Sequence, residues 1–152
     1  MASDQIVSTG VPAQPLSTPL SMVRYWGPVG LYAGFIFFGS SISNPPETVS
    51  SILNEVSDKV LHACEYSVLG ALNYRACRHA AGAWVARHAV LVAVAACAIY
   101  GLSDETHQLF VPSREADVFD LVADTMGGML GAWGWRWLEG RNAPPSVSQL
   151  GA

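Results

Sequence analysis

Four stretches of the chain combine helical length with mostly apolar residues, and short polar segments separate them. The first, Tyr25 to Ile42, has 18 residues without a charge and stops at Ser43-Asn44-Pro45-Pro46, which no helix would continue through. A membrane span needs about 20 mainly apolar residues. This stretch therefore predicts a transmembrane helix.

The other three stretches carry more charge, concentrated near their ends. Arg87 to Val111 contains a long uncharged run, and Val118 to Leu138 is interrupted only by two aspartates and one arginine. Asp58 to Cys77 is the least apolar, and alone it would also fit an amphipathic surface helix. Because two apolar stretches flank it and the connections are short, we expect an all-α fold: a polytopic membrane four-helix bundle.

The cations predict the orientation of this bundle. If the four helices cross in order, six of the eight Lys and Arg residues lie on one side, and the other side holds only Lys59 and Arg114. Cytoplasmic loops carry the excess of Lys and Arg, so we expect both termini in the cytoplasm. The five tryptophans all lie near this predicted inner interface, where Trp is enriched. The six cations are Arg24, Arg75, Arg78, Arg87, Arg136 and Arg141.

The composition agrees with a membrane domain between two tails. Only 13% of the residues are charged, against about 25% in soluble domains, and the mean hydropathy is +0.28. Residues 1–23 lack the basic start and apolar centre of a signal peptide, so we expect a flexible tail, then a membrane domain over 24–140 and a second flexible tail over 141–152. No basic stripe suggests a nucleic-acid partner, and the three cysteines show neither disulfide nor metal spacing.

The polar residues of the last three spans gather at one level, the predicted outer end. At 100° per residue they share one face of each helix. Glu65, Asp104 and Asp124 lie about 10 Å in from the outer boundary at 1.5 Å per residue. We expect the bundle to turn these faces together into one hydrated pocket that opens outward. The faces hold Asp58, His62, Glu65, Tyr66 and Leu69 with Lys59 at the edge; Asp104, Glu105 and Gln108 with His107 to one side; and Asp117, Asp120, Asp124, Gly128 and Gly131.

Charges at this depth need compensation, because one at the centre of a membrane helix costs at least about 2.5 kcal/mol. Seven acids of the cluster face two fixed cations, Lys59 and Arg114, so we expect some acids to be protonated or bridged to His62 or His107. These residue types also suit a divalent metal, although no short metallohydrolase motif is present. The alternative is a network of salt bridges that fixes the register of the helices.

Two Gly-x-x-x-Gly spacings, Gly30 to Gly34 and Gly127 to Gly131, predict close approach between helices. They serve packing within the bundle or a homodimer through the glycine faces.

Three stretches resemble the motifs of VanZ-like membrane proteins, over about residues 25–138. Asp58-Lys59, with His62 and Tyr66 following, resembles the second-span motif of that family. Tyr100 to Arg114, which reads YGLSDETHQLFVPSR, looks like its most telling stretch. Asp117-x-x-Asp120-Leu121 followed by Asp124-Thr125-x-Gly127 is similar to its fourth-span motif, although the family usually has Asn where Asp124 stands.

The resemblance implies a multi-pass protein of the bacterial cytoplasmic membrane, in a family named for a protein linked to resistance to the glycopeptide teicoplanin. It supplies no reaction, so two classes of function stay open. One is an envelope protein that contacts membrane lipids and whose outward pocket binds an anionic or lipid-linked cell-envelope component. The other is an intramembrane enzyme that acts on a phosphorylated or lipid-linked substrate by His, Asp and Glu acid–base or metal chemistry. A proton or ion pathway fits less well, because the inner halves of the spans lack polar residues.

The candidate residues follow from the cluster. The catalytic candidates are His62, Glu65, Asp104, Glu105, His107 and Asp120. The candidates for binding a substrate are Lys59, Tyr66, Gln108, Arg114 and Asp124. No cofactor is assigned beyond the divalent metal considered above.

Overall fold

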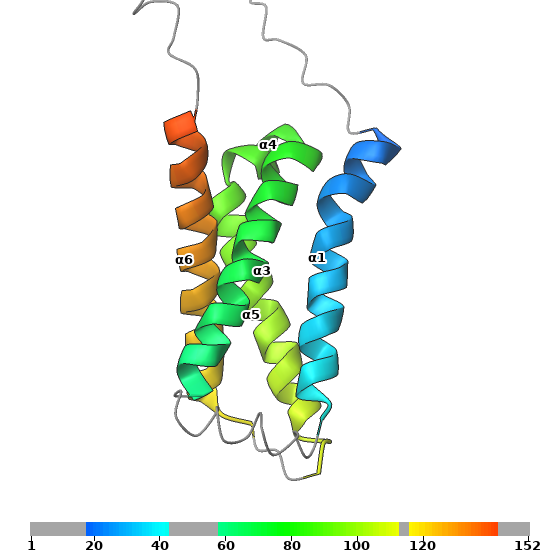
Figure 1. The fold of residues 1–152 in the computed structure, drawn as a ribbon, viewed down its shortest axis with the longest axis vertical. Coiled ribbons are helices and arrows are strands. Elements are labelled where there is room, and N and C mark those ends of the chain that lie inside the picture. Colours follow the sequence, from blue (N-terminus) through cyan, green and yellow to red (C-terminus); the bar gives the residue numbers. More distant parts are fainter. Residues whose placement is uncertain (1–17, 43–57, 113–115, 143–152) are drawn as a thin grey trace, which may run out of the picture.

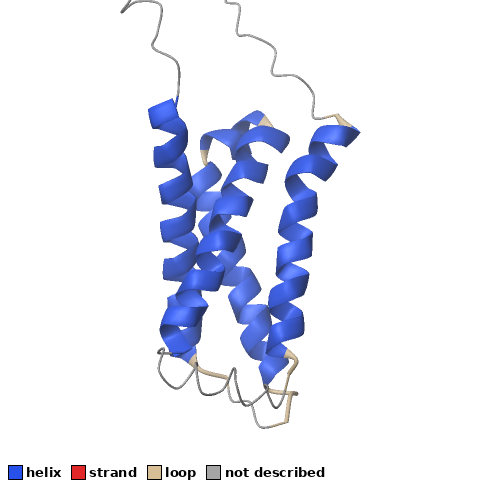
Figure 2. Cartoon of the chain, in the orientation of Figure 1, coloured by secondary structure: helices blue, strands red, loops and turns tan. Residues whose placement is uncertain are grey.

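The computed structural model describes residues 18–42, 58–112 and 116–142, which form helices joined by short turns and loops, with no strand among them (Figure 2). Four helices are long, with 20 to 25 residues each, and one is short. At 1.5 Å per residue the long helices measure about 30 to 38 Å. The prediction of an all-α chain is therefore confirmed. The helices are α1 (Pro19–Ser40), α3 (Asp58–Ala80), α4 (Ala83–Arg87), α5 (Ala89–Gln108) and α6 (Val118–Asn142).

The four long helices run along one common axis, and α3 lies against α6, α5 and α1 (Figure 1). The start of α1, helix α4 and the end of α6 lie together at one end of the bundle, which we call the termini end (Figure 1). The opposite end, where α1 and α5 finish and α3 and α6 begin, is called the cluster end (Figure 1). Three helices therefore bring their charged ends to the same level, as the sequence predicts.

The helix ends differ from the predicted ones by up to six residues, and the largest differences are the start of α1 and a break at His88. Helix α1 begins at Pro19, because Thr18 caps it by accepting a hydrogen bond from the Ser21 N–H at 3.3 Å and proline fits the first turn. Residues 19–23 of the predicted first tail and residues 141–142 of the predicted second tail are thus helical, while 1–17 and 143–152 lie outside the described residues. The stretch from Arg87 breaks at His88, where φ −105° and ψ 22° separate α4 from α5.

Glycines let α3 and α6 approach until their backbones touch. A Cβ added at Gly127 would collide with the backbone of Ala63, and one at Gly131 with the backbone of Ser67. This Gly-x-x-x-Gly pair is thus used for packing inside the chain. Around Gly30 and Gly34 no described atom lies within 4 Å of an added Cβ, so the predicted homodimer, which stays a prediction, has that face available.

Most of the buried residues are small or polar, with Ile36, Tyr66, Leu69 and Tyr74 as larger members of the core, and many large apolar residues are exposed on the outside. The buried face of α5 starts with small residues at the termini end and finishes with polar ones at the cluster end. It comprises Ala89, Ala93, Cys97, Gly101, Asp104, Glu105 and Gln108. Large apolar side chains that are more than 60% exposed include Leu31, Phe38, Leu91, Ile99, Phe119 and Trp133.

Among the described helices, α5 alone is both long and apolar enough to cross a membrane by composition, with a mean hydropathy of 1.4. Glycines and polar residues interrupt the other long helices. One of the four predicted spans therefore meets this criterion.

Candidate functional site

Lys59 joins the start of α3 to the start of α6 at the cluster end. Its Nζ lies 2.5 Å from Oδ2 of Asp117 and also binds Oδ1 of Asp120. Asp117 precedes α6, and its other oxygen accepts the N–H of Phe119 at 2.8 Å, which fits an acidic residue at a helix start. The Lys59 hydrogen bond and then the Phe119 N–H hold the pKa of the Asp117 carboxyl below its usual range.

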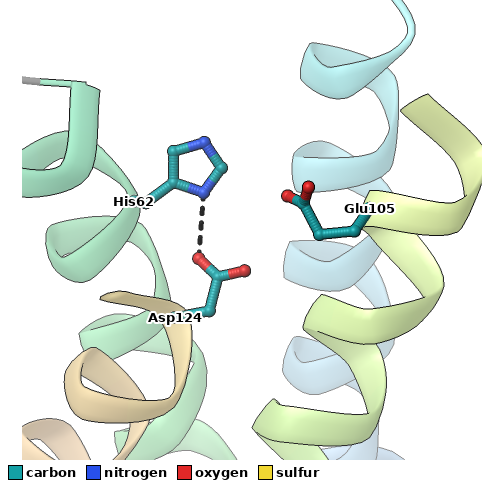
Figure 3. Close-up of side chains that lie close together, drawn as sticks. All are labelled: His62, Glu105 and Asp124. Atoms are coloured by element: carbon teal, nitrogen blue, oxygen red, sulfur yellow. Dashed lines mark hydrogen bonds and ion pairs between the residues drawn. The ribbon is translucent and has the colours of Figure 1, made fainter. Parts of the chain in front are cut away.

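Deeper in the bundle than the Lys59 group, three helices contribute one ionisable side chain each to a compact triangle (Figure 3). Nδ1 of His62 on α3 lies 2.9 Å from Oδ1 of Asp124 on α6. Glu105 on α5 faces this pair, and one nitrogen or oxygen atom of each residue lies within 4.8 Å of those of the other two. The Asp124 residue is 0% exposed and Glu105 is 6% exposed, so two carboxyl groups stand deep in the protein.

Glu105 connects this triangle to the Lys59 group. Its Oε2 accepts the backbone N–H of Asp117 at 2.7 Å, which fixes the start of α6 against α5. We refer to these two joined groups as the polar cluster. It comprises Lys59, His62, Glu105, Asp117, Asp120 and Asp124.

A second polar group faces α1. Oδ2 of Asp104 accepts hydrogen bonds from Ser40 at 2.7 Å and from the Gln108 amide at 3.2 Å. His107 also turns this way: its Nε2 lies 3.1 Å from the Ser41 hydroxyl, and its ring packs 4.4 Å from the ring of Phe37. Asp104 and His107 thus bind the end of α1, Gln108 binds Asp104, and none of the three belongs to the triangle.

The polar face predicted on α3 is divided between two neighbours. His62 points to α6, whereas Glu65 lies within electrostatic range of Tyr32 on α1. Tyr66, one turn below His62, is completely buried, and its electrostatic neighbours include Asp124 and Asp104. Tyr66 therefore lies between the polar cluster and the group that faces α1.

Four buried oxygen atoms at this level have no hydrogen-bond partner among the described residues. They are the Tyr66 hydroxyl, Oδ1 of Asp104, Oε1 of Glu105 and Oδ2 of Asp124. Buried polar atoms are normally satisfied, and an unsatisfied one costs about 1 to 3 kcal/mol. All four belong to residues at or next to the polar cluster, so the unsatisfied polar atoms are concentrated at this level of the bundle.

The structure adds two serines to the predicted polar residues, and two of the predicted residues are not described by it. The hydroxyls of Ser40 and Ser41 were not among the predicted site residues, although they end the first apolar stretch at the level of Asp104 and His107. Their position at this level of the predicted bundle could have identified them as partners of the polar residues. Arg114 lies outside the described residues, and so does the side chain of Asp58.

The termini end has the opposite charge. A cleft of about 1080 Å³ between α3, α5 and α6 is lined in part by Arg78, Arg87 and Arg136. The acid that also lines it, Glu139, accepts hydrogen bonds from Tyr74 at 3.1 Å and Trp135 at 3.2 Å, and it lies 2.9 Å from His79. The cluster end of the bundle is therefore acidic and the termini end is basic.

A protein-family model described as VanZ/LLP1 matches residues 19–139. The match begins at the first residue of α1 and ends three residues before the end of α6, so it includes every residue of the polar cluster. No curated protein and no solved structure matches the chain.

Proposed function

Because this chain belongs to the VanZ/LLP1 family, we propose that it is a multi-pass protein of the bacterial cytoplasmic membrane that binds a cell-envelope component at its cluster end. The observation that carries the proposal is the set of buried oxygen atoms that lack partners among the described residues at that end. A binding site keeps such atoms for its ligand, whereas a purely structural network would satisfy them.

The distribution of residues supports the membrane setting. Large apolar side chains such as Leu31, Ile99 and Phe119 face outward, and most of the buried residues are small or polar. This is the arrangement that suits a lipid surround, where a polar interior is shielded by the helices. Four helices of 20 to 25 residues are also long enough to cross a bilayer.

The charge of the two ends supports an orientation with both termini in the cytoplasm. The arginines lie around the termini end, and the polar cluster would then face outward. Reporter fusions at Gly82, between α3 and α4, and at the C-terminus test this. We expect cytoplasmic signals from both, and a periplasmic or extracellular signal from Gly82 would exclude the outward pocket.

The chemistry of the cluster indicates the kind of head group. Glu105, Asp104 and Asp124 offer acceptor oxygens, and Lys59 already binds two aspartates. Hydroxyl, amine and amide groups complement such a surface, as found on the sugar and peptide parts of envelope precursors. A site of this kind would connect the chain with handling of wall precursors, and so with glycopeptide resistance of the teicoplanin type.

The second candidate is an intramembrane enzyme that acts on a phosphorylated or lipid-linked substrate. The observation that favours it is the His62–Asp124 pair, because a carboxylate bound to one imidazole nitrogen sets the tautomer and orients the ring for acid–base work. A phosphate would meet repulsion from the surrounding carboxylates unless a metal cation stood between them.

Mass spectrometry of the lipids that co-purify with the protein in mild detergent tests the binding function. We expect one class of envelope amphiphile to be enriched with the wild type and lost with Glu105→Gln. Glu139→Gln, a carboxyl at the other end of the bundle, is the matched control and should retain it. Identical lipid profiles for all three proteins would refute the binding function, and His62-dependent conversion of that amphiphile would favour the enzyme.

A further inference from the structure

We propose that His62, Glu105 and Asp124 form a binding site for one divalent cation of the Mn²⁺ or Zn²⁺ type. The inference deepens the proposed function, since it concerns the same polar cluster. Cation binding is nevertheless measurable without any envelope ligand, so the two ideas are tested separately.

The spacing of the three residues suits a cation. Ligands in neighbouring positions of an octahedral ion, each at about 2.1 Å from it, are separated by about 3 Å. Nδ1 of His62 and Oδ1 of Asp124 are 2.9 Å apart, so one cation reaches both without a change of helix position. Ligands on opposite sides of such an ion are about 4.2 Å apart. All three residues offer a nitrogen or oxygen atom within 4.8 Å of those of the others, so one cation would reach all three once the Glu105 side chain adjusts.

The orientation of the carboxylates also points to a ligand between them. Figure 3 shows Glu105 reaching from α5 across the gap toward His62 and Asp124. Its Oε1 and the Oδ2 of Asp124 are buried and have no hydrogen-bond partner among the described residues. The other oxygen of each carboxylate is already engaged, Oδ1 of Asp124 by His62 and Oε2 of Glu105 by the Asp117 N–H, so one buried oxygen of each residue is left for a ligand.

The charges of the cluster favour a doubly charged ion. Lys59 is bound to Asp117 and Asp120, so its charge is shared by two carboxylates outside the triangle. In their ionised forms, which are the forms that bind metals, Glu105 and Asp124 would bring two negative charges into a region from which water is largely excluded. Burying an ionised group costs several kcal/mol, and the two charges of a divalent cation would balance the two carboxylates.

The donor atoms select the metal class. One imidazole nitrogen and two carboxylates suit Mn²⁺ or Zn²⁺, whereas Mg²⁺ and Ca²⁺ prefer oxygen ligands alone. Three protein ligands leave coordination positions for another group, as in metal sites that bind substrates. A phosphate or hydroxyl of an envelope head group fits there, next to Tyr66, whose hydroxyl is also unpartnered among the described residues. The cation would thus remove the repulsion between a phosphorylated ligand and the acidic cluster.

The test uses the full chain purified in detergent, stripped with EDTA, loaded with Mn²⁺ or Zn²⁺ and freed of excess metal. Elemental analysis should find one ion per wild-type chain. Glu105→Gln, which keeps shape and removes charge, and His62→Ala should each weaken binding at least about tenfold, since loss of even an outer partner costs 10- to 100-fold. The matched controls are His79→Ala and Glu139→Gln, which alter a His–Glu pair of the same 2.9 Å spacing at the termini end.

Two results would overturn the proposal. One is a wild-type chain that holds no stoichiometric ion after loading. The other is a Glu105→Gln chain, helical by circular dichroism, that binds the ion within twofold of the wild type. Pulsed EPR of the Mn²⁺-loaded wild type gives an independent reading, because a coordinated imidazole produces a nitrogen coupling that His62→Ala must abolish.

Lipid analysis before and after EDTA separates this inference from the proposed function. Stoichiometric metal without any enriched amphiphile would leave the cation site standing and refute the binding function. If the chain binds no ion and retains the amphiphile equally before and after EDTA, the binding function stands and the cation site is refuted.

Discussion

Oδ2 of Asp124 on α6 lies against the backbone of Gly101 on α5. A Cβ added at Gly101 would stand 2.8 Å from that oxygen and 3.2 Å from the Asp124 Cβ. The position of the most deeply buried carboxyl of the polar cluster therefore depends on a residue without a side chain. Gly101 is part of the stretch that carries the family resemblance. The contact with Asp124 gives a steric reason for a residue without a side chain at this position.

Replacing Gly101 by alanine should destabilise the protein, because the methyl group displaces Asp124 or separates α5 from α6. We expect a loss of about 1 to 3 kcal/mol, typical of overpacking. Gly134→Ala is the control: no described atom lies within 4 Å of an added Cβ there, and alanine favours a helix by up to about 1 kcal/mol. Thermal unfolding in detergent, followed by circular dichroism, compares them. A Gly101→Ala chain as stable as the wild type would contradict the contact.

Gly131→Ala should destabilise the contact between α3 and α6 more than Gly101→Ala affects its own neighbours. The added carbon meets the backbone of Ser67, which cannot turn aside as a side chain can. The matched control is Gly30→Ala on α1, where no described atom lies within 4 Å of the added carbon. Denaturant titration in mixed micelles should order the three variants, and equal stability of Gly131→Ala and Gly30→Ala would show that α3 and α6 are not in backbone contact.

Lys59→Met should leave the Asp120 carboxyl without its partner. The Asp120 side chain is 7% exposed, whereas the Lys59 and Asp117 side chains are 40% and 39% exposed. Solvent therefore screens the Lys59–Asp117 pair more strongly than the Lys59–Asp120 pair. We expect a loss of about 1.5 to 3 kcal/mol, the range for hydrogen bonds to charged groups. The double variant with Asp120→Asn should recover part of it. Additive losses in this double-mutant cycle would mean that the two side chains do not interact.

The Asp117 carboxyl should give the cluster end an acid-sensitive contribution. Its pKa is lowered in the folded protein, so its stabilising effect is complete above the usual carboxyl pKa of about 3.9 and disappears as the pH falls through the lowered value. The difference in unfolding free energy between wild type and Asp117→Asn should be constant from about pH 5 to 7 and shrink below about pH 4. A difference that grows as the pH falls would have the wrong sign.

Tyr66 and Tyr100 should respond differently to loss of their hydroxyl groups. The Tyr100 hydroxyl donates to the carbonyl of Ala33 at 2.6 Å, so Tyr100→Phe should cost about 1 kcal/mol. The Tyr66 hydroxyl has no partner among the described residues, and we expect Tyr66→Phe to be neutral or slightly stabilising. Equal losses in unfolding measurements without added ligand would show that Tyr66 has a protein partner.

The helices and their polar faces were readable from the chain because both depend on local spacing. The helices α3 and α6 begin at Asp58 and Val118, as the pattern predicts, and Asp104, Glu105 and Gln108 are buried together as one face of α5. The predicted first span starts at Tyr25, after the charge of Arg24, whereas α1 begins six residues earlier at Pro19, where Thr18 caps the helix.

The partners of the polar residues were not readable in the same way. The sequence put His62, Glu65, Asp104, Glu105, His107 and Asp120 at one level, but it left open which of them meet. In the folded chain His62 pairs with Asp124, while Asp104 and His107 bind the serines that end α1.

The sequence by itself thus determined that this protein is helical, that its charges sit at the ends of its helices and that each set occupies one face. Only the tertiary structure decided that three helices turn His62, Glu105 and Asp124 toward one point. The helical repeat fixes angles within one helix, but the rotation of one helix against another is set by packing. Between α3 and α6, the backbone contacts of Gly127 with Ala63 and of Gly131 with Ser67 set that rotation, and the partners of each contact lie more than 60 residues apart in the chain.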